Sequence, residues 1–207
     1  ALTLQNGLGN LEILRAALGP QRAMLGVTMQ SATLLGPGHV RHGGSGPTII
    51  SAPPAVEGHA GLVAALFRRA GFETHTASDV EALVWSKLIA NCAINPLTAI
   101  LRVPNGVLVE HPDARTVMLA AAGEAALVAE ALGITLGCPD PQMHALKVAE
   151  MTAANHSSML QDLLRGGRTE IESINGALVR MASELGVSTP VNETLLRLIH
   201  VLETKGT

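Results

Sequence analysis

Lys87-Leu88-Ile89-Ala90-Asn91-Cys92-Ala93-Ile94-Asn95-Pro96 is the stretch around which the rest of the chain is organised. Its apolar residues predict a helix, so that Lys87, Asn91 and Asn95 lie at positions i, i+4 and i+8 on one strip. Pro96 lacks a backbone donor and disfavours helical geometry at Asn95, so we expect the helix to kink or end there. Such polar residues often form a solvated edge, but the apolar neighbours favour a candidate site.

The composition indicates a globular protein. A chain of 207 residues is long enough to bury a core, as one large domain or two small ones. Hydrophobic residues make up 47% and charged residues 15%, which is not the composition of a disordered chain. The net charge of −3, without a basic block, gives no support to nucleic-acid binding. The aromatic residues are Trp85, Phe67 and Phe72, so platforms for base stacking are not expected either.

The number and spacing of the cysteines and histidines limit the kinds of protein to which the chain can belong. Cys92 and Cys138 form no CxxC motif and no disulfide framework, which indicates a reducing compartment such as the cytoplasm. The 8 histidines are scattered without an HExxH motif, so no metal site is expected. No uncharged apolar run is long enough to cross a membrane, and no signal peptide is visible. We therefore expect a cytoplasmic protein that binds neither membrane nor nucleic acid.

The first part of the chain reads as the end of an α/β domain. Ala1–Gln5 is typical of a strand, and Gly7-Leu8-Gly9 opens a helix that Gly19-Pro20 ends. This turn lacks the third glycine and the later acidic residue of a dinucleotide-binding fingerprint. Residues 23–51 predict an antiparallel β appendix, and Pro53-Pro54 predicts a linker.

Two further elements complete this first part. An amphipathic helix is expected from His59 to Ala70, with Leu62, Leu66 and Phe67 on its inner face. Residues 72–76 alternate like an edge strand.

After Asp79 the pattern is helical throughout. Ser78 or Asp79 caps the first of these helices. The later helices are expected from Pro112 to Gly133, from Asp140 to about Asn155, from Ser157, from Thr169 to Gly186, and from Pro190. In the helix that starts at Thr169, Ile171, Ile174, Leu178, Met181 and Leu185 form the apolar stripe, and in the last one Leu195, Leu198 and Leu202 do.

Capping offers a structural interpretation for several polar residues. Thr169 and Glu172 fit a capping box, which makes Glu172 structural, and Ser158 with Gln161 fits another. Glu170 then lies in the first turn of its helix, where the helix dipole favours a carboxylate.

Several motifs occur together in one order along the chain. They are Leu4-Gln5-Asn6-Gly7, the segment 87–99, Asn105-Gly106, Ser157-Ser158-Met159-Leu160-Gln161-Asp162, Thr169-Glu170-Ile171, Ile174-Asn175-Gly176 and Thr189-Pro190-Val191-Asn192. In this order the chain resembles the ketopantoate reductase (2-dehydropantoate 2-reductase) family almost from end to end. The resemblance implies an NADPH-dependent reduction of ketopantoate to pantoate, on the route to pantothenate and coenzyme A.

The same resemblance implies a fold. It predicts an α/β remnant of a Rossmann-type domain over residues 1–77, followed by an all-α C-terminal domain over 78–207 like that of 6-phosphogluconate dehydrogenase. The glycine-rich turn and the first strands of such a Rossmann domain are absent from these 207 residues. The expectation is that this chain alone binds NADPH poorly and is inactive alone.

The resemblance also implies roles for individual residues. Lys87 matches the general acid, and Glu170 matches a glutamate that contacts lysine, cofactor and substrate. Asn6 and Ala32, together with Glu170, match cofactor-binding positions. The positions that match substrate-binding residues are Asn91, Asn95, Asn105, Asn155, Ser157 and Ser158. These types suit the reaction, because hydride delivery to a ketone builds negative charge on its oxygen.

Two other interpretations stay open at this point. The chain can belong to a reductase of another 2-oxo acid on the same fold, since the size of a pocket is not visible in a sequence. It can also be a non-catalytic helical dimerisation module. The apolar C-terminal helices are compatible with a homodimer as well as with packing on one another.

Overall fold

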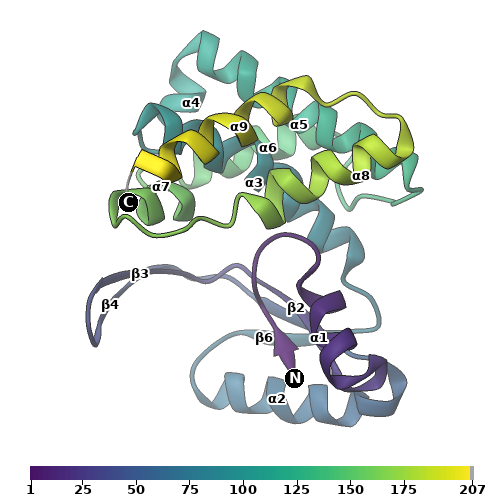
Figure 1. The fold of residues 1–207 in the computed structure, drawn as a ribbon. Coiled ribbons are helices and arrows are strands. Elements are labelled where there is room, and N and C mark those ends of the chain that lie inside the picture. The colour runs from purple at the N-terminus through teal and green to yellow at the C-terminus, as the bar shows by residue number, and fades with distance from the viewer. Residues whose placement is uncertain (206–207) are drawn as a thin grey trace. The chain divides into compact units, whose positions relative to one another are not determined.

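The computed structural model describes residues 1–205 and divides the chain into two compact units. The first unit comprises Ala1–Glu81 and the second begins at Ala82. The first contains the strands and the second is helical, as Figure 1 shows by element. The fold is therefore the α/β remnant and helical C-terminal part that the sequence predicts.

The first unit is built on a four-stranded mixed sheet. Its strands are β1 (Leu2–Thr3), β2 (Met24–Thr28), β5 (Thr48–Ser51) and β6 (Thr74–Ala77), in the order β1-β2-β5-β6. β1 pairs with β2 and β5 with β6 in parallel, whereas β2 and β5 are antiparallel. The helices of this unit are α1 (Asn10–Leu18), the 3₁₀ turns η1 (Pro20–Arg22) and η2 (Pro54–Val56), and α2 (Glu57–Arg69).

The predicted antiparallel appendix over residues 23–51 is wrong in part. Only β3 (Ser31–Gly36) and β4 (His39–Gly44) form a separate two-stranded ribbon, which extends away from β2 in Figure 1. β2 and β5, at the two ends of the same segment, belong to the main sheet. Alternation identifies a strand but not its partner, which depends on contacts distant in the sequence. The segment predicted as a linker at Pro53-Pro54 leads directly into η2.

Helix α2 packs through a different face from the one predicted. Ala60 and Ala64 are buried with Met24 and Ile50 in the core of this unit. Leu62 and Leu66 are exposed, at 66% and 60% of their surface. Both pairs are spaced by four residues, so both stripes satisfy the helical period. Small side chains let the helix approach the sheet closely, and this tertiary contact selected the alanine stripe.

The second unit contains helices throughout. They are α3 (Glu81–Leu101), α4 (Val107–Glu110), α5 (Pro112–Ala131), α6 (Pro141–Met151), α7 (Ser158–Leu164), the π-helix η3 (Glu172–Gly176), α8 (Ala177–Leu185) and α9 (Pro190–Lys205). Prolines open α5, α6 and α9 where the sequence predicts, since a helix start needs no donor at its first position. Gly186, at φ 70°, ends α8 as predicted.

Helix α6 ends at Met151, earlier than the predicted end near Asn155. The residues that follow form hydrogen bonds with a distant turn. Asn105 N–H donates to the carbonyl of Asn155, and Gly106 N–H donates to that of Ala153, each at 3.0 Å. A Cβ at Gly106 would lie 2.8 Å from that of Ala153, so only glycine permits this approach.

The sequence predicts that this helix kinks or ends at Asn95. Helix α3 does not end there but continues through Pro96 to Leu101. Asp79 caps its start, because its carboxylate accepts from Glu81 N–H at 2.9 Å. Proline cannot donate to the carbonyl four residues earlier, that of Cys92. The side chain of Asn175 donates to this carbonyl instead, at 3.1 Å.

Helix α3 is also the core of its unit. Within residues 1–205 it is the one helix long and apolar enough to cross a membrane by length and composition. Most of its apolar window is nevertheless buried inside the protein, as expected of a core helix.

The predicted capping box of Thr169 and Glu172 is wrong. Thr169 donates from its backbone and its hydroxyl to Glu203 of α9, both at 2.8 Å. Glu172 instead pairs with Arg180 and His200, each at 2.8 Å, which is still a structural role. A helix packed against the segment supplied an acceptor that local spacing could not indicate.

The apolar stripes predicted to be buried in the last two helices are confirmed only in part. Ile171, Ile174 and Leu178 are buried, whereas Leu185 is 39% exposed. In α9 Leu195 is buried, but Leu198 is 45% exposed and Ile199 takes the inner position.

A buried polar network connects α5 to α9. The carboxylate of Glu124 accepts from the backbone N–H groups of Val191 and Asn192, both at 2.9 Å. It also accepts from the side chain of Asn192, which donates in addition to the carbonyl of Ala121. A carboxylate at the first turn of α9 satisfies donors that the helix itself leaves unpaired.

We expect Glu124→Ala to lower the free energy of unfolding by about 2 to 3 kcal/mol, because three donors lose a charged acceptor. Urea unfolding followed by circular dichroism measures this. Glu130→Ala, an exposed change on the same helix, is the control and should stay within about 0.5 kcal/mol of the parent. Equal effects of the two changes would show that Glu124 does not hold α9.

Candidate active site

Three of the predicted site residues lie along α3. Lys87 and Asn91 are half-buried and Asn95 is 7% exposed, in a helix whose other side chains are mostly apolar. Because α3 is uninterrupted, their spacing by four residues places them on one strip about 12 Å long. An ammonium and two carboxamides are thus presented from the core helix.

Lys87 interacts with the carboxylate of Glu170. Burial lowers the pKa of the Lys87 ammonium, and the negative charge of Glu170 acts in the opposite direction and raises it. Glu170 lies two residues before the start of η3, and its carbonyl accepts from the N–H groups of Ser173 and Ile174 at 3.1 Å. The two predicted catalytic residues are therefore brought together, although 83 positions separate them in the sequence (170 − 87).

A third charged group belongs to this cluster. Burial raises the pKa of the Asp162 carboxyl, the charge of Glu170 raises it further, and Arg165 lowers it. Asp162 lies on α7, so α3, α7 and the segment that precedes η3 each contribute one ionisable side chain. Asp162 ends the motif Ser157-Ser158-Met159-Leu160-Gln161-Asp162, and nothing in its local spacing indicates this interaction.

Asn105 presents a buried acceptor. Its side-chain nitrogen donates to the hydroxyl of Thr152 at 2.9 Å. Its Oδ1 atom is buried, and no group in the described part of the chain donates to it. A buried amide oxygen without a donor costs stability, so it is available to a ligand that carries a hydroxyl or ammonium group.

Ser157 has a structural position beside the strip. Its hydroxyl accepts from Leu160 N–H at 3.1 Å and caps α7, and it also accepts from the Thr98 hydroxyl at 2.8 Å. The capping alternative for Ser158 is wrong, since Ser158 is the first residue of the helix and is exposed. Ser157 thus attaches α7 to α3 and leaves Ser158 as the accessible hydroxyl.

The remaining predicted residues lie apart in the chain. The backbone of Asn155 binds Asn105, and its side chain is half-buried. In the first unit, Asn6 follows β1 and its carbonyl accepts from the side chain of Asn10 at 3.1 Å. Ala32 lies in β3 and is exposed. Asn6 occupies the carboxyl end of a parallel strand, a usual position for ligand contacts in α/β sheets.

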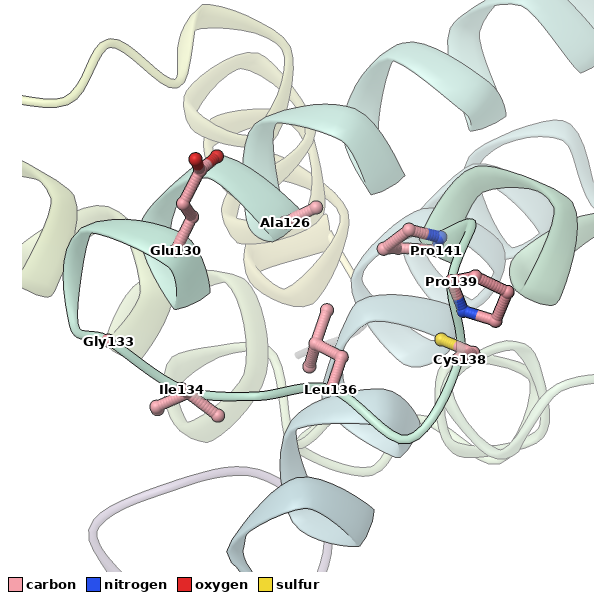
Figure 2. A pocket seen from close by; sticks show the side chains of 8 residues that line it. All are labelled: Ala126, Glu130, Gly133, Ile134, Leu136, Cys138, Pro139 and Pro141. Atoms are coloured by element: carbon pink, nitrogen blue, oxygen red, sulfur yellow. The ribbon is translucent and has the colours of Figure 1, made fainter.

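Two hollows occur elsewhere in the helical unit. One, of about 420 Å³, is lined by residues from the end of α5, the following loop and the start of α6, including Glu130 and Cys138 (Figure 2). The other, of about 390 Å³, is lined mainly by apolar side chains around the end of α3 and the start of α5. Neither is lined by a predicted site residue, so the strip and its polar contacts define the candidate site.

The described side chains include no metal-binding cluster, and the cysteine beside the strip, Cys92, is not suited to act as a nucleophile. Within residues 1–205, no group of three or more His, Cys, Asp or Glu side chains is arranged to hold a metal ion. Cys92 is fully buried, and burial raises the pKa of its thiol far above the ordinary range. A thiol in this state is inert as a nucleophile.

Family models match most of the chain. Residues 79–203 match the model described as ketopantoate reductase PanE/ApbA C terminal, and residues 1–55 match ketopantoate reductase PanE/ApbA. A relative from Archaeoglobus fulgidus, named 2-dehydropantoate 2-reductase, is 44% identical over 203 residues. That alignment covers 98% of this chain and 67% of the relative. The chain thus spans about two thirds of the length of this relative.

Solved structures agree. The crystal structure of a PanE/ApbA family ketopantoate reductase from Ralstonia eutropha JMP134 has a TM-score of 0.87 at 38% identity, covering 99% of this chain and 67% of that one. The ternary structure of D-mandelate dehydrogenase with NADH and anilino(oxo)acetate has a TM-score of 0.90 at 30% identity, covering 99% and 68%. The sequence, the fold and these matches together show that the chain belongs to the ketopantoate reductase family.

Proposed function

We propose that the protein reduces 2-dehydropantoate to pantoate with NADPH, and that Lys87 is the general acid. The observation that carries the proposal is the half-buried Lys87 ammonium, which interacts with Glu170 and heads a strip of two asparagines. Membership of the family, with a 44% identical relative named 2-dehydropantoate 2-reductase, supports the choice of substrate.

The residues of this chain act on the ketone and its neighbouring groups. A bound nicotinamide cofactor supplies the hydride that reduces the ketone carbon. As charge develops on the ketone oxygen, Lys87 donates its proton there and the oxygen becomes a hydroxyl group. Lys87 then recovers a proton from solvent. Asn91 and Asn95 offer amide donors to the substrate carboxylate, and the Oδ1 atom of Asn105 offers an acceptor to its hydroxyl.

The contacts with the nicotinamide cofactor are proposed residue by residue. Asn6 follows a parallel strand, where an amide side chain suits the nicotinamide carboxamide. Ala32 and Glu170 are proposed as further cofactor contacts, and Asn155, Ser157 and Ser158 as substrate contacts. Because the Ser157 hydroxyl already caps α7, Ser158 is the stronger candidate of the two serines. Both cysteines are free, in keeping with a cytoplasmic enzyme.

A second candidate is the reduction of another 2-oxo acid. D-mandelate dehydrogenase, with a TM-score of 0.90, is solved with NADH and anilino(oxo)acetate, a 2-oxo acid that carries an aromatic amide. Steady-state kinetics of the complete gene product with 2-dehydropantoate and with phenylglyoxylate, each with NADPH and NADH, separates the two candidates. A higher kcat/KM for phenylglyoxylate would replace the proposed substrate, and a preference for NADH would replace the proposed cofactor.

We expect Lys87→Ala to reduce kcat by roughly a hundredfold or more, because the developing alkoxide loses both its proton donor and its nearby cation. The measurement is NADPH consumption at saturating 2-dehydropantoate by the complete gene product. Lys147→Ala, on α6, is the matched control and should keep the parent kcat. Wild-type turnover in Lys87→Ala would show that Lys87 is not the acid.

The pH profile of kcat provides a second test. The acid must be protonated, so kcat falls as pH rises through the pKa of Lys87, which burial places below the ordinary lysine value. Glu170 raises this pKa, so Glu170→Gln should move the alkaline limb to lower pH. Glu172→Gln, whose carboxylate pairs with Arg180 and His200, is the control and should leave the limb in place. Coincident profiles for wild type and Glu170→Gln would contradict the assignment.

A further inference from the structure

A charge interaction and a hydrogen bond connect α3 to the segment 170–175. The first is the attraction between Lys87 and Glu170. The second is the hydrogen bond from the side chain of Asn175 to the carbonyl of Cys92, at 3.1 Å. Cys92 and Asn175 each lie five positions after the corresponding member of the first pair (92 − 87 and 175 − 170). The two elements therefore run in the same direction and are joined twice in the same register.

The second contact exists because of Pro96. In an uninterrupted helix the carbonyl of residue 92 would accept from the N–H of residue 96, which proline lacks. A buried carbonyl without a donor is costly, and Asn175 supplies the donor from another element. Asn175 is fully buried, and its nitrogen also donates to Oδ1 of Asn192 at 3.0 Å.

Asn175 is rigidly connected to Glu170. The N–H of Ile174 donates to the carbonyl of Glu170, and the N–H of Gly176 donates to that of Ile171 at 2.9 Å, which closes the wider turn of the π-helix. Ile171 and Ile174 are buried on either side of this turn. A shift of Asn175 relative to α3 is therefore transmitted to Glu170.

The amide of Asn175 also carries a cost. Its Oδ1 atom is buried and has no donor among the residues that the structure describes. An apolar side chain of similar size would avoid this cost but would leave the Cys92 carbonyl unpaired. The hydrogen bond that the side-chain nitrogen donates to the Cys92 carbonyl of α3 thus accounts for an asparagine at this position.

We propose that Asn175 is a positioning residue, which replaces the hydrogen bond that Pro96 removes from α3 and thereby holds Glu170 against Lys87. The inference rests on the proposed function, since it assigns Asn175 to the alignment of the two catalytic residues. Pro96 thereby affects the site, because its missing N–H leaves the carbonyl of Cys92 to accept from the side chain of Asn175.

The test is the titration of Lys87 in Asn175→Leu, followed by NMR of labelled lysine side chains in the complete gene product. The Lys87 signal is identified by its loss in Lys87→Ala. Leucine keeps the volume but cannot donate, so Glu170 is released and its charge raises the pKa of Lys87 less. Asp162 is the other acid that interacts with Glu170, and it stays in place on α7. We expect the pKa of Lys87 to fall, and kcat to fall roughly tenfold or more.

Asn192→Leu is the matched control. It removes the bond between Asn192 and Asn175 and the side-chain bonds from Asn192 to Ala121 and Glu124, but it leaves the bond from Asn175 to Cys92. We expect it to lower the melting temperature without moving the titration of Lys87. If both leucine variants lose stability and neither changes that titration, Asn175 is only structural and the proposal is overturned.

A second experiment uses Pro96→Ala as the background and asks whether a restored backbone N–H recovers part of the stability that Asn175→Leu loses. Alanine at 96 restores an N–H for the Cys92 carbonyl, so Asn175→Leu should cost less stability in this background than alone. The attachment of Glu170 is still missing, so Lys87 in the double variant should titrate at lower pH than in Pro96→Ala. Should Asn175→Leu alone fail to fold, this comparison decides the proposal, and identical titrations would overturn it.

The titration needs no substrate. If the wild-type protein reduces neither 2-dehydropantoate nor phenylglyoxylate, the proposed function fails, while the pKa of Lys87 still reports whether Asn175 holds Glu170 in place. The two failures are therefore distinguishable.

Discussion

The carbonyl of Cys92 cannot accept from the N–H of residue 96, because that residue is proline, and the donor that replaces it connects α3 to the rest of the helical unit. Asn175 donates to it and to Asn192, and Asn192 in turn contacts Ala121 and Glu124. Four elements, α3, η3, α9 and α5, thus meet in one buried polar network. Because a buried N–H or carbonyl group that loses its partner costs stability, each of these bonds favours one register between the elements that it joins, which apolar packing alone specifies less strictly.

The candidate site depends on the same core helix. Lys87 extends from a helix that is otherwise apolar, so desolvation favours the neutral amine and the charge of Glu170 favours the ammonium. These opposing effects suit the proposed role of Lys87, in which a general acid gives up a proton and recovers it afterwards. The hydroxyls of Thr98 and Ser157 attach α7 to the same helix, so the cluster that includes Asp162 is built on rigid elements.

Local signals in the sequence predicted the elements well. Prolines at 112, 141 and 190 mark helix starts because their missing N–H is not needed there, and Gly186 adopts the positive φ that ends α8. The predictions that were wrong depended on distant partners. The capping box of Thr169 was displaced by Glu203, and the inner face of α2 was taken by alanines because small residues pack closely on the sheet.

The sequence by itself determined the elements, the family and the residues to consider, since these follow from local chemistry and from motifs in a fixed order. It could place Lys87, Asn91 and Asn95 on one strip, because a helical period is a local property. The resemblance implied a contact between Glu170 and Lys87, and the structure brings the two residues together. Only the tertiary structure decided that α3 continues through Pro96 and that Asn175 donates to the carbonyl of Cys92. The attraction between Glu170 and Lys87 and the bond from Asn175 to Cys92 each join residues 83 positions apart (170 − 87 and 175 − 92). Their energies appear only when folding brings the two groups out of water together.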